Sequence, residues 1–448
     1  WFLRGETDAK ILDSQGCKIW NGNSTREFLD SRGLQHLEVG DCGANYSHQW
    51  RHYNADYIDC NTDYTGKGID QISYIEDKLK NDKDSRRILL NSWNPCQLNQ
   101  TVLPPCFTKN SFVITNNGYK YINDVEDSDL LLTHLGNFNK INKKYITPYS
   151  GDIFNIKLQY QTIPIQATAN HPFYVRKVIY KKYPRLTLTE CSEPYWVNAQ
   201  DLTYDHYFGI QINTKNNIPI FSYKKKGKIC NKILNNIDEW YLLGYFLGDG
   251  WCRWDRDYGD FNLVFNHNDE EYLFNKFKNL CNMRIKKKQK GCTVYDCYSF
   301  ELVYILKQFG RKAHNKIIPE WVQDAPSKFI EKFIDGYIKA DGCRVKNKNK
   351  YSITTTSYNI AYGIQRLLLK LNKFSGIIYT KKKSYHEIEG RIVNQRDIYN
   401  INIYDSTSKR PFIKNNYAWI PIKNIDIEYQ SNINVYNFDI ENDHTYTV

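Results

Sequence analysis

A cysteine and a histidine stand where they could rearrange a peptide bond. Cys106 follows Leu-Pro-Pro, and TANHPFYV occupies residues 168–175. A thiol beside a peptide bond can attack the preceding carbonyl, here that of Pro105, and form a thioester. Because an amide nitrogen is a poor leaving group until it is protonated, His171 is the candidate general acid, and Thr168 and Asn170 could orient the amide or the imidazole. Each of these residue types alone more often has a structural role, so the interpretation depends on their occurring together.

Two aspartates recur in one repeated frame. LLGYFLGDGW (242–251) and FIDGYIKADGC (333–343) share the pattern x-x-G-Y-x-x-x-D-G, which places Asp249 and Asp341 92 positions apart. Each copy is followed by a strand-like and then a helix-like run, so the repeat predicts a domain with pseudo-twofold symmetry. One Asp-Gly pair is more often a helix end or a turn, but two copies at this spacing favour a shared two-acid site.

Length and charge suggest several domains, one of which meets a polyanion. The 448 residues suffice for two to four domains, and 41% hydrophobic composition is enough to form real cores. Residues 1–105 carry 12 Lys and Arg against 15 Asp and Glu, whereas 236–412 carry 30 against 20. A basic surplus suits nucleic acid. A solvated surface, or the codon bias of an AT-rich genome, would produce a similar surplus.

The expected elements change along the chain. FVITNNGYKYI (112–122) predicts a hairpin around Asn-Gly, and alternating strand patterns continue to about residue 235. The pattern from residue 236 is helical, and short alternating strands return over 416–448. This return predicts a β domain interrupted by an inserted mixed domain.

Residues 1–105 resemble thymidylate synthase. Three separated blocks carry the resemblance in order: 1–34, GDCGANYSHQWRHYNADY (40–57) and DSRRILLNSWNP (84–95), followed by LPPC. The resemblance implies a partial α/β synthase segment whose complete enzyme methylates dUMP to dTMP with methylenetetrahydrofolate, as a homodimer. The adjacent guanidinium groups of Arg86 and Arg87 also suit bidentate binding of a phosphate dianion.

The same resemblance assigns five site residues. Arg86 and Arg87 match the arginines that reach across the dimer to the nucleotide phosphate, and Tyr46 matches a tyrosine of the proton-relay network. Trp20 and Asn23 match positions that line the folate and nucleotide pocket. The family's catalytic glutamate would precede Trp1 and much of its fold would follow this segment, so we expect no thymidylate synthesis from this chain alone.

Residues 106–235 and 413–448 resemble the Hint β-fold of inteins, which perform protein splicing. The three matching blocks are the one that opens at Cys106, TANH with His171, and NVYNFDIENDHTYTV (434–448). The resemblance implies an N–S acyl shift at Cys106 and a role for His444 in the last step. The terminal His-Asn pair would lie beyond Val448, as would the synthase's catalytic cysteine.

Residues 236–412 resemble the LAGLIDADG homing endonucleases. The family packs its two motif helices through small residues, here Gly244, Gly248, Gly336 and Ala340. The resemblance implies a two-repeat αββαββα domain that delivers Asp249 and Asp341 to one phosphodiester, where paired carboxylates suit Mg²⁺. Lys316 matches a lysine of that site. Basic clusters that could neutralise phosphates flank both halves: Lys286–Lys288 with Lys290; Lys346, Lys348 and Lys350; and Lys381–Lys383.

The hypothesis is therefore a multidomain α+β chain: a synthase segment (1–105), and an all-β splicing domain (106–235 and 413–448) split by an endonuclease (236–412). Its expected partner is double-stranded DNA, specifically the uninterrupted synthase gene. Two alternatives stay open. The repeat could be a catalytically dead DNA- or RNA-binding module within the splicing domain, or the chain could be an autoproteolytic Hint protein.

The expected compartment is reducing. The chain has no apolar run near the roughly 18 residues of a membrane span, and Trp1 opens no signal peptide. Twelve cysteines lie scattered without paired metal spacing. We therefore expect a cytoplasmic protein without membrane contact.

Overall fold

The computed structural model describes residues 35–41, 46–51, 105–181, 187–225, 227–253, 259–345, 350–382, 385–388, 391–404 and 411–448. The chain divides into two compact units, residues 1–104 and 105–448. Within the first unit, β1 (Gln35–Asp41) pairs antiparallel with β2 (Tyr46–Arg51). No helix among the described residues is long and apolar enough to cross a membrane.

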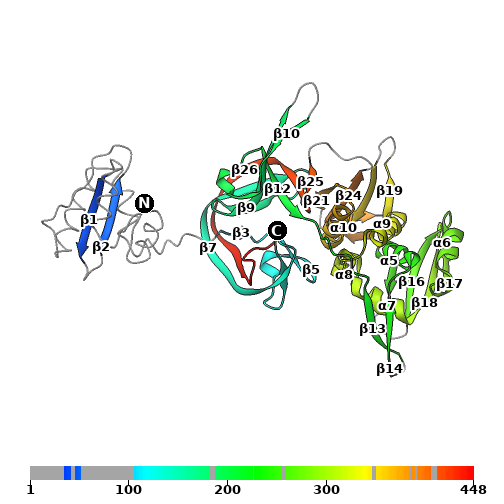
Figure 1. Cartoon of the computed structure of the whole chain (residues 1–448). Helices are drawn as coiled ribbons and strands as arrows, with labels where there is room; N and C mark the ends of the chain where they lie inside the picture. Colours follow the sequence, from blue (N-terminus) through cyan, green and yellow to red (C-terminus); the bar gives the residue numbers. More distant parts are fainter. Residues whose placement is uncertain are drawn as a thin grey trace. The chain divides into compact units, whose positions relative to one another are not determined.

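The β region of the second unit is one twelve-stranded sheet (Figure 1). Its strand order is β10-β9-β12-β26-β3-β8-β7-β6-β4-β5, with β11 on β9 and β25 on β26. The strands before the α/β body are β3 (Phe107–Thr108), β4 (Phe112–Thr115), β5 (Gly118–Tyr121), β6 (Leu130–Leu132), β7 (Phe138–Leu158), β8 (Ile165–Thr168), β9 (Pro172–Lys181), β10 (Thr187–Cys191), β11 (Tyr195–Asn198) and β12 (His206–Gln211). The strands after it are β25 (Phe412–Lys414) and β26 (Tyr417–Ile440).

Two long strands hold this sheet together. β26 pairs antiparallel with β7 from Ile422 opposite Leu158 to Ile440 opposite Ile141, with three register irregularities. β26 also pairs with β12 and β3, so the segment after the α/β body returns to the sheet that begins beside Cys106. The expected hairpin is confirmed as β4–β5, in which Gly118 has φ +98° at the turn.

The α/β body contains two halves with the same strand order. The first half consists of α5 (Ile237–Asp249), β15 (Gly250–Cys252), β16 (Asp260–Asn266), α6 (Glu270–Phe277), β17 (Asn282–Gln289), β18 (Cys292–Tyr298) and α7 (Phe300–Leu306). The second consists of α9 (Ser327–Asp341), β19 (Gly342–Arg344), β20 (Lys350–Thr355), α10 (Tyr358–Lys370), β21 (Ser375–Thr380) and β24 (Ile398–Tyr404). The sheets run β15-β16-β18-β17 and β19-β20-β24-β21, and a short α8 (Glu320–Gln323) lies between the halves.

The halves differ in two details. A hairpin of β22 (Tyr385–Ile388) and β23 (Arg391–Asn394) is inserted in the second half, where the first half has only the turn at Gly291. The helix that should close the second repeat, by analogy with α7, does not occur in described residues 391–404 or 411–448.

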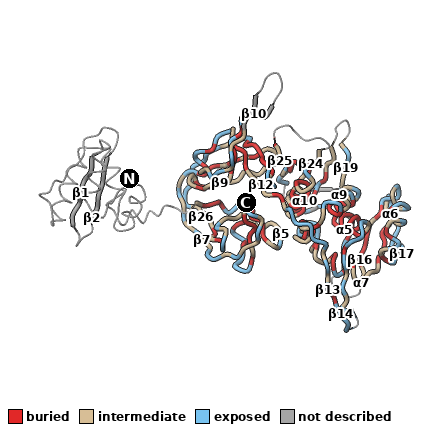
Figure 2. The backbone as a smooth tube through the Cα atoms, viewed as in Figure 1, coloured by how far each residue is buried: buried red, intermediate tan, exposed pale blue. Residues whose placement is uncertain are grey.

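The core of the body surrounds α5. Every residue from Glu239 to Leu247 is buried, which explains why the helix is apolar around its whole circumference rather than on one stripe (Figure 2). The Asn236 side chain caps its start by accepting a hydrogen bond from the Asp238 backbone N–H, and Ser357 caps α10 in the same manner.

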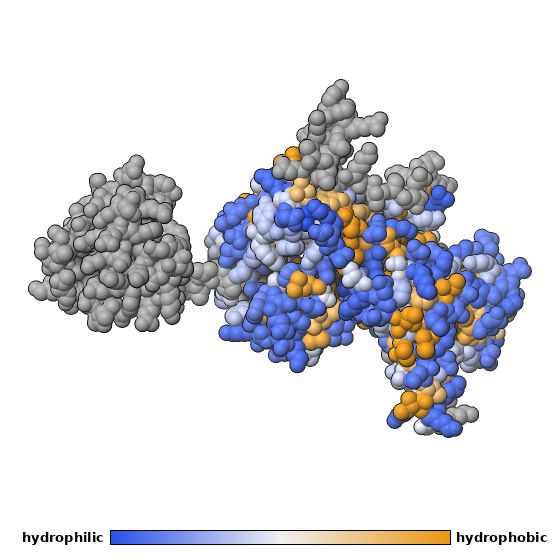
Figure 3. Space-filling model, in the orientation of Figure 1, coloured by the Kyte–Doolittle hydropathy of each residue, from blue (hydrophilic) through white to orange (hydrophobic). Residues whose placement is uncertain are grey.

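One hairpin within residues 106–235 lies outside the twelve-stranded sheet. β13 (Ile220–Lys225) and β14 (Lys228–Ile233) form a separate two-stranded sheet. The rings of Phe221 and Tyr223 pack on Trp321 and on Phe300 of the α/β body. The body therefore begins before residue 236, and Figure 3 shows apolar surface on this projecting hairpin, where Ile229 is 73% exposed.

Candidate functional site

The last residues of α5 and α9 are Asp249 and Asp341. The helices meet at glycines: a Cβ on Gly244 would lie 1.8 Å from the Phe333 carbonyl oxygen, and one on Gly336 would lie 2.0 Å from the Tyr241 carbonyl oxygen. The structure thus brings the two helices together through the small residues of the repeated frame. At their ends, a Cβ on Gly248 would lie 2.9 Å from the Asp341 carboxylate, beside Asp249.

The two carboxyl groups interact unfavourably with each other. Burial, and then the nearby Asp341 carboxylate, raise the pKa of Asp249 to about 6 against the opposing effect of Lys316. Burial also raises the pKa of Asp341, although this residue is the more exposed of the two, while Lys316 lowers it. An electropositive group between these acids would relieve their repulsion.

Lys316 lies at the C-terminus of α5. Its Nζ donates to the carbonyl oxygens of Phe246 (3.0 Å), Leu247 (2.7 Å) and Gly250 (2.9 Å). Burial lowers the pKa of its ammonium group to about 8, whereas Asp341, Cys252 and Asp249 act in the opposite direction. The sequence suggested that Lys316 contributes to the acidic site. The structure adds a second role, because the Lys316 ammonium group caps carbonyl groups at the negative end of the α5 dipole, where the Phe246 carbonyl also accepts from the Gly250 N–H.

The donor set of this site fits a hard divalent cation. It consists of carboxylate oxygens from two chain segments, and burial raises the pKa of both carboxyl groups. Within the described ranges, no group of three or more His, Cys, Asp or Glu side chains is arranged to hold a metal ion. The remaining ligands would therefore be water and substrate oxygens, as is usual for Mg²⁺.

The described lysines of the basic clusters lie on strands and turns, where Lys350 is partly buried and the others are exposed. Lys286, Lys287 and Lys288 occupy the outer strand β17, where Lys286 Nζ lies 3.1 Å from Asp296 Oδ1. In the second half, Lys350 Nζ donates to Asn402 Oδ1 at 2.8 Å. Lys381 and Lys382 are exposed, whereas Lys346, Lys348 and Lys383 lie outside the described residues.

A second candidate site surrounds Cys106. The Cys106 side chain is fully buried, and its backbone N–H donates to Thr168 Oγ1 at 3.0 Å. The Thr168 backbone N–H donates in return to the Cys106 carbonyl oxygen at 3.0 Å, and Thr168 Oγ1 donates to Asn170 Oδ1 at 2.8 Å. The nitrogen of the Pro105–Cys106 peptide bond is therefore held by the threonine of the TANH segment.

His171 lies on the other side of the same peptide bond. Its ring is hydrogen-bonded to the Pro105 backbone, and because proline has no N–H group, the acceptor is the Pro105 carbonyl oxygen. No partner for Nδ1 occurs in the part of the chain that the structure describes, so Nε2 is the donor. Burial lowers the pKa of His171 to about 3, which keeps the imidazole neutral. We expected His171 to act on the amide nitrogen, but its ring contacts the carbonyl oxygen.

The thiol itself is in an apolar setting. Cys106 packs with Ile153 and Val435, and burial raises the pKa of the thiol to about 12. Phe107, the next residue, lies with its ring centroid 3.9 Å from that of His171. The site therefore holds a neutral thiol beside a neutral imidazole.

Residues 434–448, the last block of the Hint resemblance, differ in how they lie relative to this site. His444 is exposed and its Nδ1 lies 3.1 Å from Asp439 Oδ1, whereas Cys106 is fully buried. Sequence reasoning missed Tyr446, whose ring centroid is 5.9 Å from that of Phe107 and whose hydroxyl donates to Asn437 Oδ1 at 2.8 Å. Its aromatic type in an alternating strand-like block was the only available signal.

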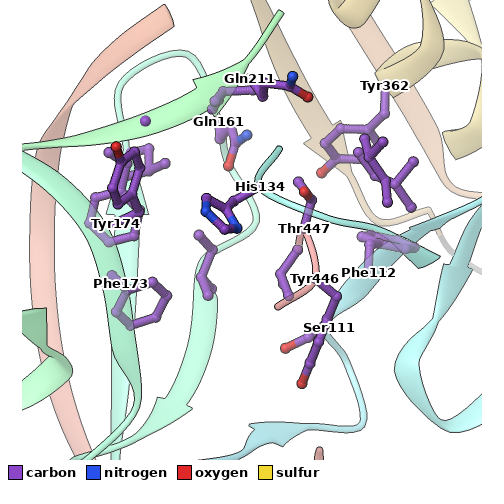
Figure 4. A pocket seen from close by; sticks show the side chains of 18 of the residues that line it. Ser111, Phe112, His134, Gln161, Phe173, Tyr174, Gln211, Tyr362, Tyr446 and Thr447 are labelled. Carbon is purple, nitrogen blue, oxygen red and sulfur yellow. The ribbon is translucent and has the colours of Figure 1, made fainter. Parts of the chain in front are cut away.

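A cavity of about 180 Å³ adjoins this second site. Figure 4 shows side chains from the β region around it, among them His134, Phe173 and Tyr446, and Tyr362 from α10 on the other side. The space beside His171 is consequently lined by both parts of the second unit.

The synthase-type residues cannot be placed together. Trp20, Asn23, Arg86 and Arg87 lie outside the described residues, and Tyr46 is described only as the first residue of β2, opposite Asp41.

Two family models match the chain. Residues 1–158 match thymidylate synthase, and residues 328–404 match the LAGLIDADG-like domain. The chain therefore contains a thymidylate synthase segment at its N-terminus and a LAGLIDADG-like domain further along, which confirms these two of the three expected resemblances. The resemblance to the Hint fold of inteins stays a prediction. Neither match covers residues 159–327 or 405–448. The first match continues past the structural division at Pro104 and Pro105 into β3–β7.

The curated relatives support the first segment. A bifunctional dihydrofolate reductase-thymidylate synthase of Paramecium tetraurelia is 53% identical over 116 residues, which are 26% of this chain and 25% of that protein. Thymidylate synthase of Ascaris suum is 47% identical over 116 residues, or 26% of this chain and 40% of that protein. The chain thus spans a quarter to two fifths of these relatives.

Solved structures overlap only loosely. The homing endonuclease I-DmoI in complex with DNA and Ca is 16% identical, with 38% of this chain and 83% of that chain covered at a TM-score of 0.27. Full-length DUF199/WhiA from Thermatoga maritima is 13% identical, with 38% and 52% covered at a TM-score of 0.26. Overlaps of this extent carry no functional weight.

Proposed function

We propose that residues 106–448 interrupt a thymidylate synthase as a self-splicing domain, and that its inserted α/β body is a site-specific DNA endonuclease. The observation that carries the splicing proposal is the Pro105–Cys106 peptide bond, whose nitrogen is held by Thr168 and whose carbonyl is held by His171. This bond stands at the division between the two units, and the twelve-stranded sheet begins with β3 directly after it.

The splicing step is an isomerisation. The Cys106 sulfur attacks the Pro105 carbonyl carbon, a C–S bond forms and the C–N bond breaks. The thiol proton ends on the leaving nitrogen, so a thioester and a free amine replace an amide and a thiol. His171 Nε2–H stabilises the negative charge that develops on the carbonyl oxygen, and Thr168 orients the amide nitrogen.

Thioester trapping tests this step. The purified chain is incubated with excess dithiothreitol, and the fragments are measured by intact mass. We expect release of a fragment that ends at Pro105 from wild type and none from Cys106→Ala. Equal release from both proteins would refute the assignment. Once the complete chain has spliced, the restored synthase would methylate dUMP with methylenetetrahydrofolate.

The endonuclease proposal rests on the convergence of Asp249 and Asp341 at the ends of two closely packed helices. Their carboxylates would hold Mg²⁺, which when bound supplies Lewis-acid chemistry at a phosphodiester. The residues themselves fix this geometry: the glycines bring the helices together, and Lys316 holds the end of α5 and moderates the acids' repulsion. The lysines of β17 would contact DNA phosphates.

A cleavage assay tests this proposal. The substrate is a long duplex that carries the uninterrupted synthase gene around the Pro-Pro-Cys codons, with Mg²⁺ present. We expect double-strand cleavage by wild type, and intact binding without cleavage by Asp341→Asn. If wild type binds the duplex as well as Asp341→Asn does and cleaves none of it, the catalytically dead module would be favoured instead.

A further inference from the structure

Helix α10 packs against both parts of the second unit. Its residues Ile360, Ile364 and Leu367 lie in the core of the α/β body. Leu369, on the same helix, lies instead in the core of the β region, as does Phe374 just beyond it. α10 is therefore a shared element that connects the LAGLIDADG-like half to the sheet that holds Cys106.

The principal polar contact of α10 with the β region is made by Asn359. Its Oδ1 accepts a hydrogen bond from the Tyr119 backbone N–H at 2.6 Å, at the turn of the β4–β5 hairpin. A Cβ on Gly118 would lie 2.5 Å from that same Oδ1, so the turn leaves room for the asparagine as well as adopting φ +98°. The Tyr119 hydroxyl donates in turn to the Tyr362 carbonyl oxygen at 3.4 Å.

Aromatic rings reinforce this contact. The Phe112 ring on β4 lies with its centroid 4.9 Å from that of Tyr358 and 5.4 Å from that of Tyr362. Tyr119 also lies 5.4 Å from Tyr362. Pairs at these separations stabilise an interface beyond the area they bury, so the β4–β5 hairpin is fixed to α10 rather than free at the sheet edge.

The hairpin is in turn connected to the thiol. The Ile114 backbone N–H on β4 donates to the Thr447 carbonyl oxygen at 3.2 Å, and Thr447 follows Tyr446. The Tyr446 ring packs on the ring of Phe107, the residue after Cys106, and the Phe107 ring packs in turn on that of His171. A continuous series of contacts therefore runs from Asn359 to the peptide bond at Cys106.

We propose that Asn359 is a positioning residue for the Cys106 site, through which the inserted α/β body holds the β4–β5 hairpin, and with it Tyr446 and Phe107, against the Pro105–Cys106 bond. This inference rests on the proposed splicing function. It means that the insert supports the splicing site as well as carrying its own two-acid site.

The test compares Asn359→Ala with Asn359→Asp in the full chain, since aspartate keeps an acceptor for the Tyr119 N–H. Glu271→Ala is the matched control, because Glu271 is the second residue of α6, the counterpart of α10 in the first half, and is exposed. Two rates are measured: release of the fragment ending at Pro105 with dithiothreitol, and alkylation of Cys106 by iodoacetamide, followed by peptide mass spectrometry. DNA cleavage is recorded in parallel.

We expect Asn359→Ala to slow release about tenfold, the effect of one partly buried hydrogen bond left unmade. Alkylation of Cys106 should accelerate as the site loosens. Asn359→Asp should restore both rates towards wild type, and Glu271→Ala should change neither.

The inference is overturned if Asn359→Ala leaves both rates unchanged, or if DNA cleavage falls in proportion to release, which would indicate general unfolding. Should wild type release no fragment that depends on Cys106, the splicing proposal fails instead. The alkylation rates of the four proteins then decide by themselves whether α10 controls the Cys106 site.

Discussion

Gly244 and Gly336 face each other's helices so closely that neither can carry a side chain. The Cβ that alanine would add lies 1.8 Å from the Phe333 oxygen in one case and 2.0 Å from the Tyr241 oxygen in the other. Because both obstacles are backbone atoms, rotation of a side chain cannot relieve the clash. The spacing of α5 and α9, and so of Asp249 and Asp341, depends on these two positions.

Gly244→Ala should therefore destabilise the second unit by about 3 kcal/mol or more, at the upper end of overpacking effects. The measurement is urea unfolding followed by circular dichroism. Gly291→Asn is the control, since Gly291 has φ +87° and open space around it, and asparagine tolerates that conformation. Similar midpoints for the two variants would contradict the close helix contact.

Asp249→Asn should abolish DNA cleavage and yet stabilise the fold at neutral pH. The pKa of Asp249 is raised from 3.8 to about 6, so the folded chain binds this proton more tightly than the unfolded chain does. The free energy of unfolding of wild type, relative to Asp249→Asn, should accordingly fall as pH rises from about 4 to 6. Thermal unfolding of both proteins across this range measures the difference, and a constant difference would show that Asp249 has an ordinary pKa.

Lys316→Met should lower the free energy of unfolding by about 1–3 kcal/mol, because the carbonyl groups of Phe246, Leu247 and Gly250 lose the hydrogen bonds from the Lys316 ammonium group. The pKa of Lys316 is depressed from 10.5 to about 8, so the unfolded chain binds this proton more tightly. The stability of wild type relative to Lys316→Met should therefore rise between about pH 8 and 10.5. Lys312→Met, at an exposed lysine on the same segment, is the control, and should be nearly silent.

Thioester formation at Cys106 should accelerate about tenfold per pH unit from pH 7 to 9, because the thiol pKa is raised to about 12 and the thiolate fraction grows in that proportion. The trapping thiol is kept in excess so that its own attack does not limit the rate. With a pKa of about 3, His171 should add no inflection near pH 6.5. A plateau reached at pH 7 would mean that the thiol is activated by a neighbouring group.

Much of the inserted body could be predicted from local sequence. The repeated Gly-Tyr and Asp-Gly frame identifies both helices, because close helix contact requires small residues at fixed spacing. Alternation over residues 220–233 predicts strands but not the surface on which they pack, and the β13–β14 hairpin packs on the α/β body. The pairing of β26 with β7 joins distant segments, and alternation in either strand cannot specify its register.

The site residues also divide into those that the sequence predicts and those whose contacts only the structure identifies. Cys106, Thr168 and His171 are close together, as their residue types suggested, but which atom His171 contacts depends on three-dimensional geometry. His444 matched a family block and lies exposed. Asn359 gave no signal at all, because its role depends on a turn more than 200 residues away in sequence.

The pairing of β26 with β3 also sets an order of events during synthesis. Cys106 is translated early, yet the strand beside it pairs with Val435 and Tyr436, which leave the ribosome only after the whole α/β body has been made. Until then β7 lacks β26, the strand that pairs with it along most of its length. Pairing between strands so far apart in sequence forms slowly. The strand surroundings of the Cys106 bond are therefore completed only after the insert and the final strand have been made.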